Sequence, residues 1–408
     1  MWLPRCECSV LLGHRMTGWE RPARAAASTL AVAAFFALLP PAAVGGAMAT
    51  PVLLCLAGAL AFRPSLFRQA VDTWAWPLWL LLAFVAWALA TSLWSAQPGH
   101  AKALKLTVLI PFGLMFAASA AAEPTRRLTC AAGIAAFIVL AALLSIEVLW
   151  DLPLNRAANP EIPPGEVVRN VFRGAAVLLA LTWAPAAALL IQGRRIAAGA
   201  LLVASSLLVA LPFDLWAHLA AFVAGLGAFA LAFRAPRAAV MGVSGGLAAW
   251  MLAAPFLTPA ILASQRLVDA LPESWAHRAG IWNYVCARIL EQPWVGRGLD
   301  ASRADTRHVI VRGVEISAIP MHPHSASLQI WYETGAIGAL LAALALVAAG
   351  RALSGVFANN RPAAAAAAAT LAALGVVANV SFSAWQEWWI ATMFVAAALV
   401  GALALRRA

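Results

Sequence analysis

Long apolar runs separated by arginine-bearing connections constrain the fold of this chain more than any other feature. A membrane-spanning helix needs about 20 mostly apolar residues. The chain of 408 residues is 63% hydrophobic and 11% charged, with a mean hydropathy of +0.83, which lies outside the range of soluble domains. We therefore predict an all-α, polytopic integral membrane protein. About twelve spans fit between the charged connections, at residues 25–43, 46–62, 75–95, 101–121, 128–150, 173–192, 195–212, 214–233, 238–258, 325–349, 362–381 and 384–405.

The arginines predict the orientation of these spans, because short cytoplasmic loops retain Lys and Arg. Every second connection carries an arginine pair, and arginines also lie at both ends of the chain. The pairs are Arg63 and Arg68, Arg126 and Arg127, Arg194 and Arg195, Arg234 and Arg237, Arg351 and Arg361, and Arg406 and Arg407. We therefore predict that both termini are cytoplasmic. The net charge of +11 is mostly this topological signal, so we do not expect nucleic-acid binding.

The connections divide the chain into four segments. Residues 1–24 form a cytoplasmic tail, and residues 25–258 contain the first nine spans with a Pro- and Asn-containing periplasmic loop at about 151–172. Residues 259–324 form a large periplasmic loop between the ninth and tenth spans, which is too long for a plain connector. Residues 325–408 contain the last three spans.

The large loop contains the pattern of an amphipathic helix, "PESWAHRAGIWNYVCARIL". Trp275, Arg278 and Trp282 fall near one face of this helix at three- and four-residue steps. The segment "EQPWVGRGLD" follows, and its Pro293, Gly296 and Gly298 suit a tight turn. A basic residue and two indoles are thus expected together at the membrane interface.

A polar stretch, "HPHSASLQIWYETGAIGALL", opens the tenth span. Ser325 or Ser327 can cap the helix, which places His324 at its outer entrance. Ser325, Gln329 and Glu333 then recur every four residues along one side. An ionisable group in hydrocarbon costs several kcal/mol, so this stripe is expected to border a cavity open to the outside.

These motifs resemble those of a known family. "H-x-H-S-x-x-L-Q-x-x-x-E-x-G-x-x-G", residues 322–338, resembles the signature of the O-antigen ligase and O-antigen polymerase superfamily of bacterial envelope glycosyltransferases. "HRAGIWNYVCARILEQPWVGRG" is similar to its R-x-x-x-W and P-x-x-G-x-G motifs, and "NVFRGAAVLLALTWAP" to its Arg-Gly helix start. The resemblance covers about the last 240 residues. The sequence departs from the family at Ser325, where Asn is usual, and at "PFDLWAHLA", where a Ser-rich turn is usual.

The resemblance implies transfer of a glycan from undecaprenyl diphosphate to the lipid A core at the periplasmic face of the bacterial inner membrane. Arg173, at the outer end of the sixth span, and Arg278 would bind the diphosphate, because guanidinium groups engage phosphate oxygens bidentately. His324 would accept or orient the proton of the acceptor hydroxyl. Further substrate-binding candidates are His322, Gln329, Glu333 and Trp282.

We expect no metal and no cofactor. The first outer loops, "PPAAVGGA" and "WSAQPGH", contain no acidic residue that could ligate a cation. The five cysteines have no spacing that suits a metal site or a disulfide framework. The expected partners are the lipid-linked donor, the lipid A core and membrane lipids.

Each candidate residue has an alternative interpretation. Arg173 can anchor a helix at the headgroup level, and Arg278 can pair with Glu273 or stack on a neighbouring Trp. The two histidines can be interfacial caps, and Glu333 can support other residues rather than contact substrate.

Two further pairs and two further functions stay open. Lys102 and Lys105 can hold lipid phosphates or extend to the interface, and Asp214 and His218 can support the site. An O-antigen polymerase would use the same donor with a second lipid-linked glycan as acceptor. A transporter or flippase predicts internal repeats and broken helices, and the sequence shows no such repeats.

Overall fold

The chain folds almost entirely into helices, as expected for an all-α polytopic membrane protein. The computed structural model describes residues 20–404 except for residues 74, 98–99, 124 and 211–214. The helices are α1 (Glu20–Val44), α2 (Thr50–Ala61), α3 (Pro64–Thr73), α4 (Ala75–Thr91), α5 (Ala101–Ala121), α6 (Thr125–Leu149), α7 (Pro153–Ala158), α8 (Pro164–Ile191), α9 (Arg195–Ala210), α10 (Trp216–Arg234), α11 (Pro236–Ile261), α12 (Gln265–Ala270), α13 (Glu273–Glu291), α14 (Ala326–Val356), α15 (Arg361–Val380) and α16 (Glu387–Gly401). Shorter elements are the 3-10 turns η1 (Ser92–Trp94) and η2 (Ala301–Ala304) and the antiparallel strands β1 (His308–Val311) and β2 (Val314–Ser317).

Each of the twelve predicted spans corresponds to one helix. Nine helices of the described chain are long and apolar enough to cross a membrane, whereas α2, α9 and α16 are apolar but shorter. The number of spans therefore stays a prediction. The predicted amphipathic helix is α13, and α3 was not predicted as a separate element.

The sixth predicted span begins earlier than expected. Helix α8 starts at Pro164 rather than at residue 173, because Pro163 is the N-cap and a proline at the first helical position has a backbone preset for helix. Arg173 therefore lies in the third turn of α8 and not at its outer end.

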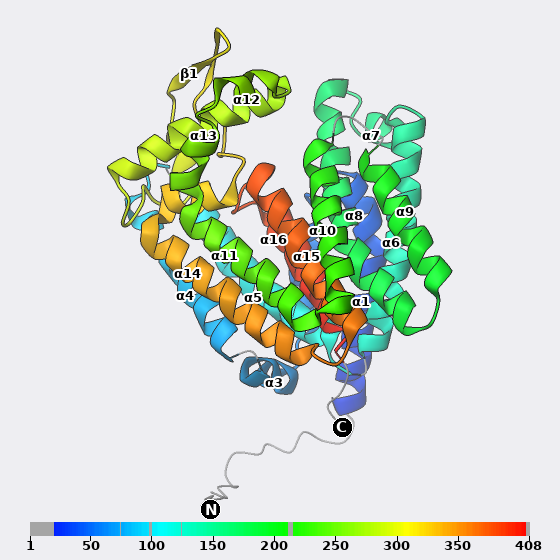
Figure 1. Cartoon of the computed structure of the whole chain (residues 1–408). Coiled ribbons are helices and arrows are strands. Elements are labelled where there is room, and N and C mark those ends of the chain that lie inside the picture. The colour runs from blue at the N-terminus through cyan, green and yellow to red at the C-terminus, as the bar shows by residue number, and fades with distance from the viewer. Residues whose placement is uncertain (1–19, 74, 98–99, 124, 211–214, 405–408) are drawn as a thin grey trace, which may run out of the picture.

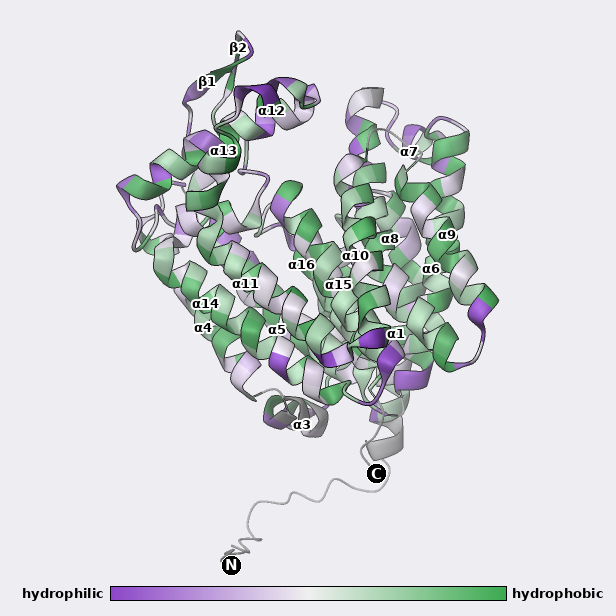
Figure 2. Ribbon diagram, viewed as in Figure 1, coloured by the Kyte–Doolittle hydropathy of each residue, from purple (hydrophilic) through white to green (hydrophobic). Residues whose placement is uncertain are grey.

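The helices form two groups joined by the C-terminal pair (Figure 1). Helices α4, α5, α11 and α14 lie on one side, beneath α12, α13 and the β hairpin, and α1, α6, α8, α9 and α10 lie on the other. Helix α15 contacts α8, α10 and α11, and α16 contacts α5 and α8, so these two helices bridge the groups. Hydrophobic residues follow the helices, while hydrophilic ones gather toward both ends of the bundle (Figure 2).

The two long connections lie at the same end of the bundle, near α7 and α13 (Figure 1). This arrangement agrees with the predicted topology, which places both loops in the periplasm. We expect cysteines at Ala158 and at Val314, which is 54% exposed, to react with a membrane-impermeant thiol reagent in cells with a permeabilised outer membrane. A cysteine at the exposed Arg194, in a predicted cytoplasmic turn, is the matched control and should react only after the inner membrane is broken. The reverse labelling pattern would contradict the topology.

A break in α14 anchors the long loop to the membrane helices. Gly335 has φ of +67° and ψ of −169°, which interrupts the helix. Residues 293–298 fill the break: the amide of Ala336 donates to the Pro293 carbonyl at 2.7 Å, and the amide of Gly298 donates to the Glu333 carbonyl at 2.8 Å. A Cβ at Gly335 would lie 2.3 Å from the Trp294 carbonyl oxygen, so only glycine fits there. The tight turn predicted around Gly296 and Gly298 is thus the segment that docks into the helix.

Candidate functional site

A strained turn at the start of α14 presents the two histidines. His324 adopts a left-handed backbone with φ of +57°, which is uncommon for a non-glycine residue and clusters at functional sites. Three bonds hold this conformation. The Trp282 indole N–H donates to the Pro323 carbonyl at 2.8 Å, the His324 amide donates to Nδ1 of His322 at 3.2 Å, and Ser325 caps the helix by accepting from the Leu328 amide at 3.4 Å.

The hydrogen bonds of His324 fix its tautomer. Its Nδ1 lies 2.8 Å from the Ser381 carbonyl oxygen, and because a carbonyl only accepts, Nδ1 must carry the proton. Nε2 then keeps its lone pair, and the described residues provide no hydrogen bond to it. Burial, and next the charge of Arg278, lower the pKa of His324 to about 4. The imidazole is therefore neutral at pH 7 and can accept a proton through Nε2.

Arg278 lies on α13, close enough to the two histidines for its charge to lower the pKa of both. One terminal nitrogen donates to the Ser274 carbonyl at 2.9 Å, and the guanidinium carbon lies 5.6 Å from the centre of the Trp275 ring. Stacking on Trp275 is thus present, whereas Glu273 instead lies 3.8 Å from His277. Within the described chain, Arg278 has no carboxylate partner, and its Nε is buried without a hydrogen bond. Burial lowers the pKa of Arg278, but a guanidinium stays charged.

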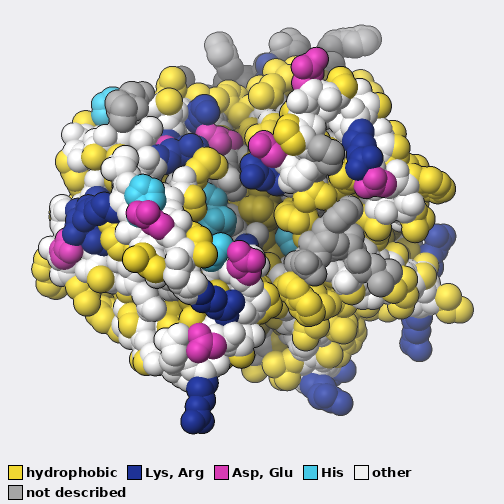
Figure 3. Space-filling model, turned by 90° about the horizontal axis from the view of Figure 1, so that it is seen from above, with side chains coloured by type: hydrophobic (Ala, Val, Ile, Leu, Met, Phe, Trp, Pro, Cys, Tyr) yellow, Lys and Arg dark blue, Asp and Glu magenta, His cyan; other side chains and the backbone are white. Residues whose placement is uncertain are grey.

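Two further cations lie near this turn. Lys102 pairs with Glu387 at 2.9 Å, and Arg303 pairs with Asp300 at 3.1 Å. Burial lowers the pKa of His322 well below its usual value, and the neighbouring His324, Arg303, Arg278 and Lys102 side chains lower it further. Seen from this end, histidine side chains border a central hollow with Lys and Arg around it (Figure 3). The sequence signal for Lys102 was a lysine at an outer helix end, against the trend of the arginine pairs.

The polar stripe of α14 forms an internal clamp. Gln329 and Glu333 are fully buried. The carboxylate of Glu333 accepts from the Asp300 amide at 2.6 Å, from the Ser302 amide and hydroxyl, from Nε2 of Gln329 at 3.0 Å and from the Trp385 indole at 2.6 Å. The expectation that these two side chains border an open cavity is therefore wrong. They hold residues 300–302 and Trp385 against α14, and a direct substrate contact stays a prediction for both.

Arg173 lies on the other helix group. Its guanidinium donates to Oδ1 of Asn170 at 3.3 Å, and Asn170 donates to Asn155 at 2.8 Å. Asn155 in turn donates to the buried carboxylate of Glu147 at 2.6 Å. The described contacts do not join Arg173 directly to Arg278 or His324. Neither Glu147 nor Asn155 was predicted from the sequence, although a single acid at the end of an apolar run is a usable signal.

The linker between α15 and α16 contacts both His324 and His218. Ser381 accepts from His324, and the ring of Phe382 lies 6.0 Å from that of His218. His218 is buried beside the Phe172 backbone, but neither ring nitrogen reaches hydrogen-bond geometry with a described residue. His218 thus lies between α8, which carries Arg173, and the linker that contacts His324, while Asp214 lies outside the described residues.

An apolar pocket of about 340 Å³ adjoins the histidine turn. Trp275 and Trp282 line it from α13, Ser325 and Leu328 from α14, and Asn379 from α15. It is thus bordered by residues next to Arg278 and His324. Among the residues that the structure describes, no group of three or more His, Cys, Asp or Glu side chains has the arrangement of a metal site.

This fold and cluster define a polytopic membrane protein with a cationic, histidine-containing site at the end of the bundle that carries the long loop. Residues 167–343 match the sequence model of the O-antigen ligase family. The matched stretch runs from α8 into α14 and contains Arg173, Arg278 and His324. The resemblance found from the motifs is confirmed, although the match ends before α15 rather than covering the last 240 residues.

Several curated relatives are similar to this protein over part of the chain. One from Rickettsia conorii, named "Putative polysaccharide ligase", is 31% identical over 127 residues, which is 30% of each chain. Proteins with the same description from Rickettsia bellii and Rickettsia typhi are 32% and 29% identical over 123 and 125 residues. The alignments thus span under a third of the relatives' length. No solved structure matches the chain.

Proposed function

We propose that the protein is an O-antigen ligase, which transfers a glycan from undecaprenyl diphosphate to the lipid A core at the periplasmic face of the bacterial inner membrane. One observation carries the proposal: a neutral His324 with a free Nε2 lies beside Arg278, which has no carboxylate partner among the described residues. A proton acceptor next to an available guanidinium suits attack by a sugar hydroxyl and departure of a diphosphate.

The roles follow from charge and burial. The anomeric carbon gains a bond to the acceptor oxygen as its bond to the diphosphate breaks, so negative charge develops on the leaving group. Arg278 can stabilise that charge, with Lys102 and Arg303 adding positive potential nearby. His324 takes the hydroxyl proton through Nε2. The adjoining apolar pocket would hold the first isoprene units of the donor.

Arg173 lies on α8, in the other helix group from Arg278 and His324. Its network through Asn170, Asn155 and Glu147 fixes the helix turn from which the guanidinium projects. We propose that Arg173 contacts the donor diphosphate or the glycan attached to it when the substrate is bound. The alternative role as a headgroup anchor stays open, because the described contacts do not join Arg173 to His322 or His324.

A deletion strain tests the proposal against the polymerase alternative. Loss of a ligase should remove every glycan-capped band from a lipopolysaccharide gel and accumulate lipid-linked polymer. Loss of a polymerase should instead leave bands with a single repeat unit. A wild-type gel pattern with unchanged lipid-linked glycan would contradict both glycosyltransferase functions and return attention to a transporter.

A further inference from the structure

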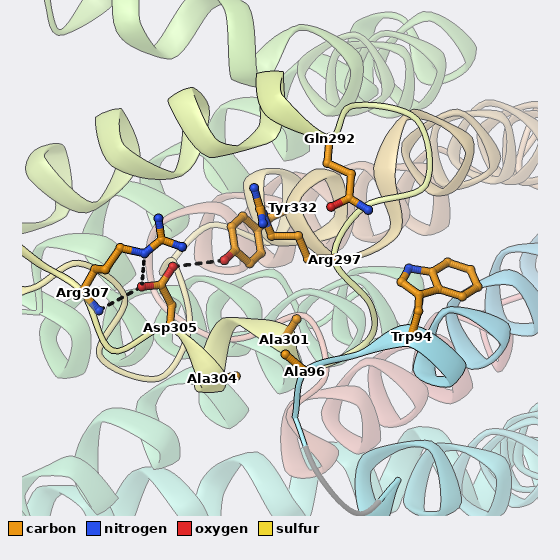
Figure 4. A pocket seen from close by; sticks show the side chains of 9 residues that line it. All are labelled: Trp94, Ala96, Gln292, Arg297, Ala301, Ala304, Asp305, Arg307 and Tyr332. Atoms are coloured by element: carbon orange, nitrogen blue, oxygen red, sulfur yellow. Dashed lines mark hydrogen bonds and ion pairs between the residues drawn. The ribbon is translucent and has the colours of Figure 1, made fainter.

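A second pocket, of about 270 Å³, opens on the long loop (Figure 4). Its polar and aromatic lining comprises Trp94, Gln292, Arg297, Asp305, Arg307 and Tyr332. The segment 300–305 borders both sites: the charge of Arg303 acts on His322, whereas Ala301 and Ala304 line the second pocket. The pocket is thus separate from the histidine site and adjacent to it. None of its lining residues has a role in the transfer step above.

The aromatic rings of this pocket are held in place before any ligand binds. The indole N–H of Trp94 donates to the Gly296 carbonyl at 3.2 Å, and the side chain remains partly exposed. The hydroxyl of Tyr332 donates to Asp305 at 3.2 Å, and that of Tyr284 donates to the same carboxylate at 2.8 Å. Sugar rings pack their C–H faces on fixed aromatic rings and bond their hydroxyls to surrounding polar groups, so this lining suits a saccharide.

The charges of the pocket leave one cation in excess. Arg288 and Arg297 both pair with Glu291, and Arg307 lies 3.6 Å from Asp305. Burial alone would raise the pKa of Asp305, but the Arg307 amide, the Tyr284 hydroxyl and the Arg307 charge hold it below its usual value. Asp305 is therefore ionised, and three guanidinium groups face two carboxylates. A ligand with a single negative charge would balance the site.

We propose that this pocket binds one anionic sugar residue, a pyranose that carries a carboxylate or a phosphate. Its volume is slightly below the usual range of ligand sites, roughly 300–1,000 Å³, which suits one ring rather than a chain. Trp94 provides the stacking face and Arg307, whose side chain is 52% exposed, provides the donor for the anion. The purpose of such a site rests on the proposed glycan transfer, since the sugar would belong to the acceptor or to the donor glycan. Binding itself does not require transfer.

Saturation-transfer NMR on the full chain in nanodiscs tests the pocket with methyl glucuronide and methyl glucoside, which share a ring and differ in charge. We expect the glucuronide to bind at least about tenfold more tightly, the Arg307→Gln variant to lose this preference, and Trp94→Ala to weaken both sugars. Arg266→Gln, a change of the same type at an exposed position of α12, is the matched control and should bind like the wild type. Equal binding of the two sugars, or an unchanged preference in Arg307→Gln, would overturn the proposal.

Competition then identifies the source of the sugar. Displacement of the glucuronide by delipidated core oligosaccharide would assign the pocket to the acceptor, and displacement by released O-antigen polysaccharide would assign it to the donor. Displacement by neither would overturn the proposal as a glycan subsite. A chain that binds the glucuronide but transfers no glycan would contradict only the proposed function, and one that transfers glycan without this binding would contradict only the second site.

Discussion

His324→Ala should reduce glycan transfer by about 100- to 10,000-fold while donor binding stays close to that of the wild type. The reason is that Nε2 of His324 faces the acceptor hydroxyl in the proposed reaction, whereas the donor diphosphate contacts arginine. Single-turnover transfer, measured beside donor affinity on purified protein, separates the two effects. In the wild type, transfer should fall as the pH drops through about 4, because protonation then removes the base.

The control for this prediction is His308→Ala, which changes an exposed histidine on β1 of the same loop and should transfer normally. Arg278→Lys gives the complementary pattern, since it keeps the charge but loses the planar, two-pronged donor. Its transfer rate should fall about 100-fold, as for other lost transition-state donors. Wild-type transfer by His324→Ala would show that the histidine turn is only structural.

Glu333→Gln should destabilise the protein by at least about 2 kcal/mol, although the two side chains have the same shape. Each carboxylate oxygen of Glu333 accepts from two or more donors: Ser302 and Gln329 contact one, and Asp300 and Trp385 contact the other. An amide must present its own N–H groups to one of these sets, so donors would face donors in a buried site. Equilibrium unfolding of the purified protein in detergent measures the loss.

Glu315→Gln is the matched control, because Glu315 is exposed on β2 and should leave the unfolding free energy unchanged. The destabilised variant should also lose protection of residues 293–302 against hydrogen exchange, since these residues depend on α14. A Glu333→Gln variant with wild-type unfolding and exchange would contradict the clamp and favour a direct substrate contact for Glu333.

The sequence predicted the elements of the site better than their contacts. Ser325 caps α14, α13 forms where its pattern indicated, and the glycines after it have the positive φ of a tight turn, because each of these features depends on a few neighbouring residues. The four-residue spacing of Gln329 and Glu333 correctly excluded a lipid-facing stripe. It could not distinguish a cavity from a clamp, since the partners Asp300 and Trp385 come from distant segments.

The other differences between the predictions and the structure involve residues that are far apart in the sequence. Arg173 and Arg278 were both expected to bind the diphosphate beside His324, yet Arg173 lies on the opposite helix group, and no described contact joins it to Arg278 or His324. The pairing of Lys102 with Glu387 joins residues 285 positions apart, which no local pattern encodes. The polar pocket at Arg307 is likewise assembled from η1, the segment after α13, η2 and α14, so its residues carry no shared motif.

The break at Gly335 also limits how the long loop can move relative to α14. Backbone bonds from residues 293–298 fill the gap in α14, so this segment of the loop is part of the hydrogen-bond pattern of the helix. Lifting the loop as a lid would expose unpaired amides and carbonyls within the helix, at a cost of about 1–3 kcal/mol for each one left buried. We therefore expect a substrate of the proposed reaction to reach the histidine turn while residues 293–298 stay docked in α14.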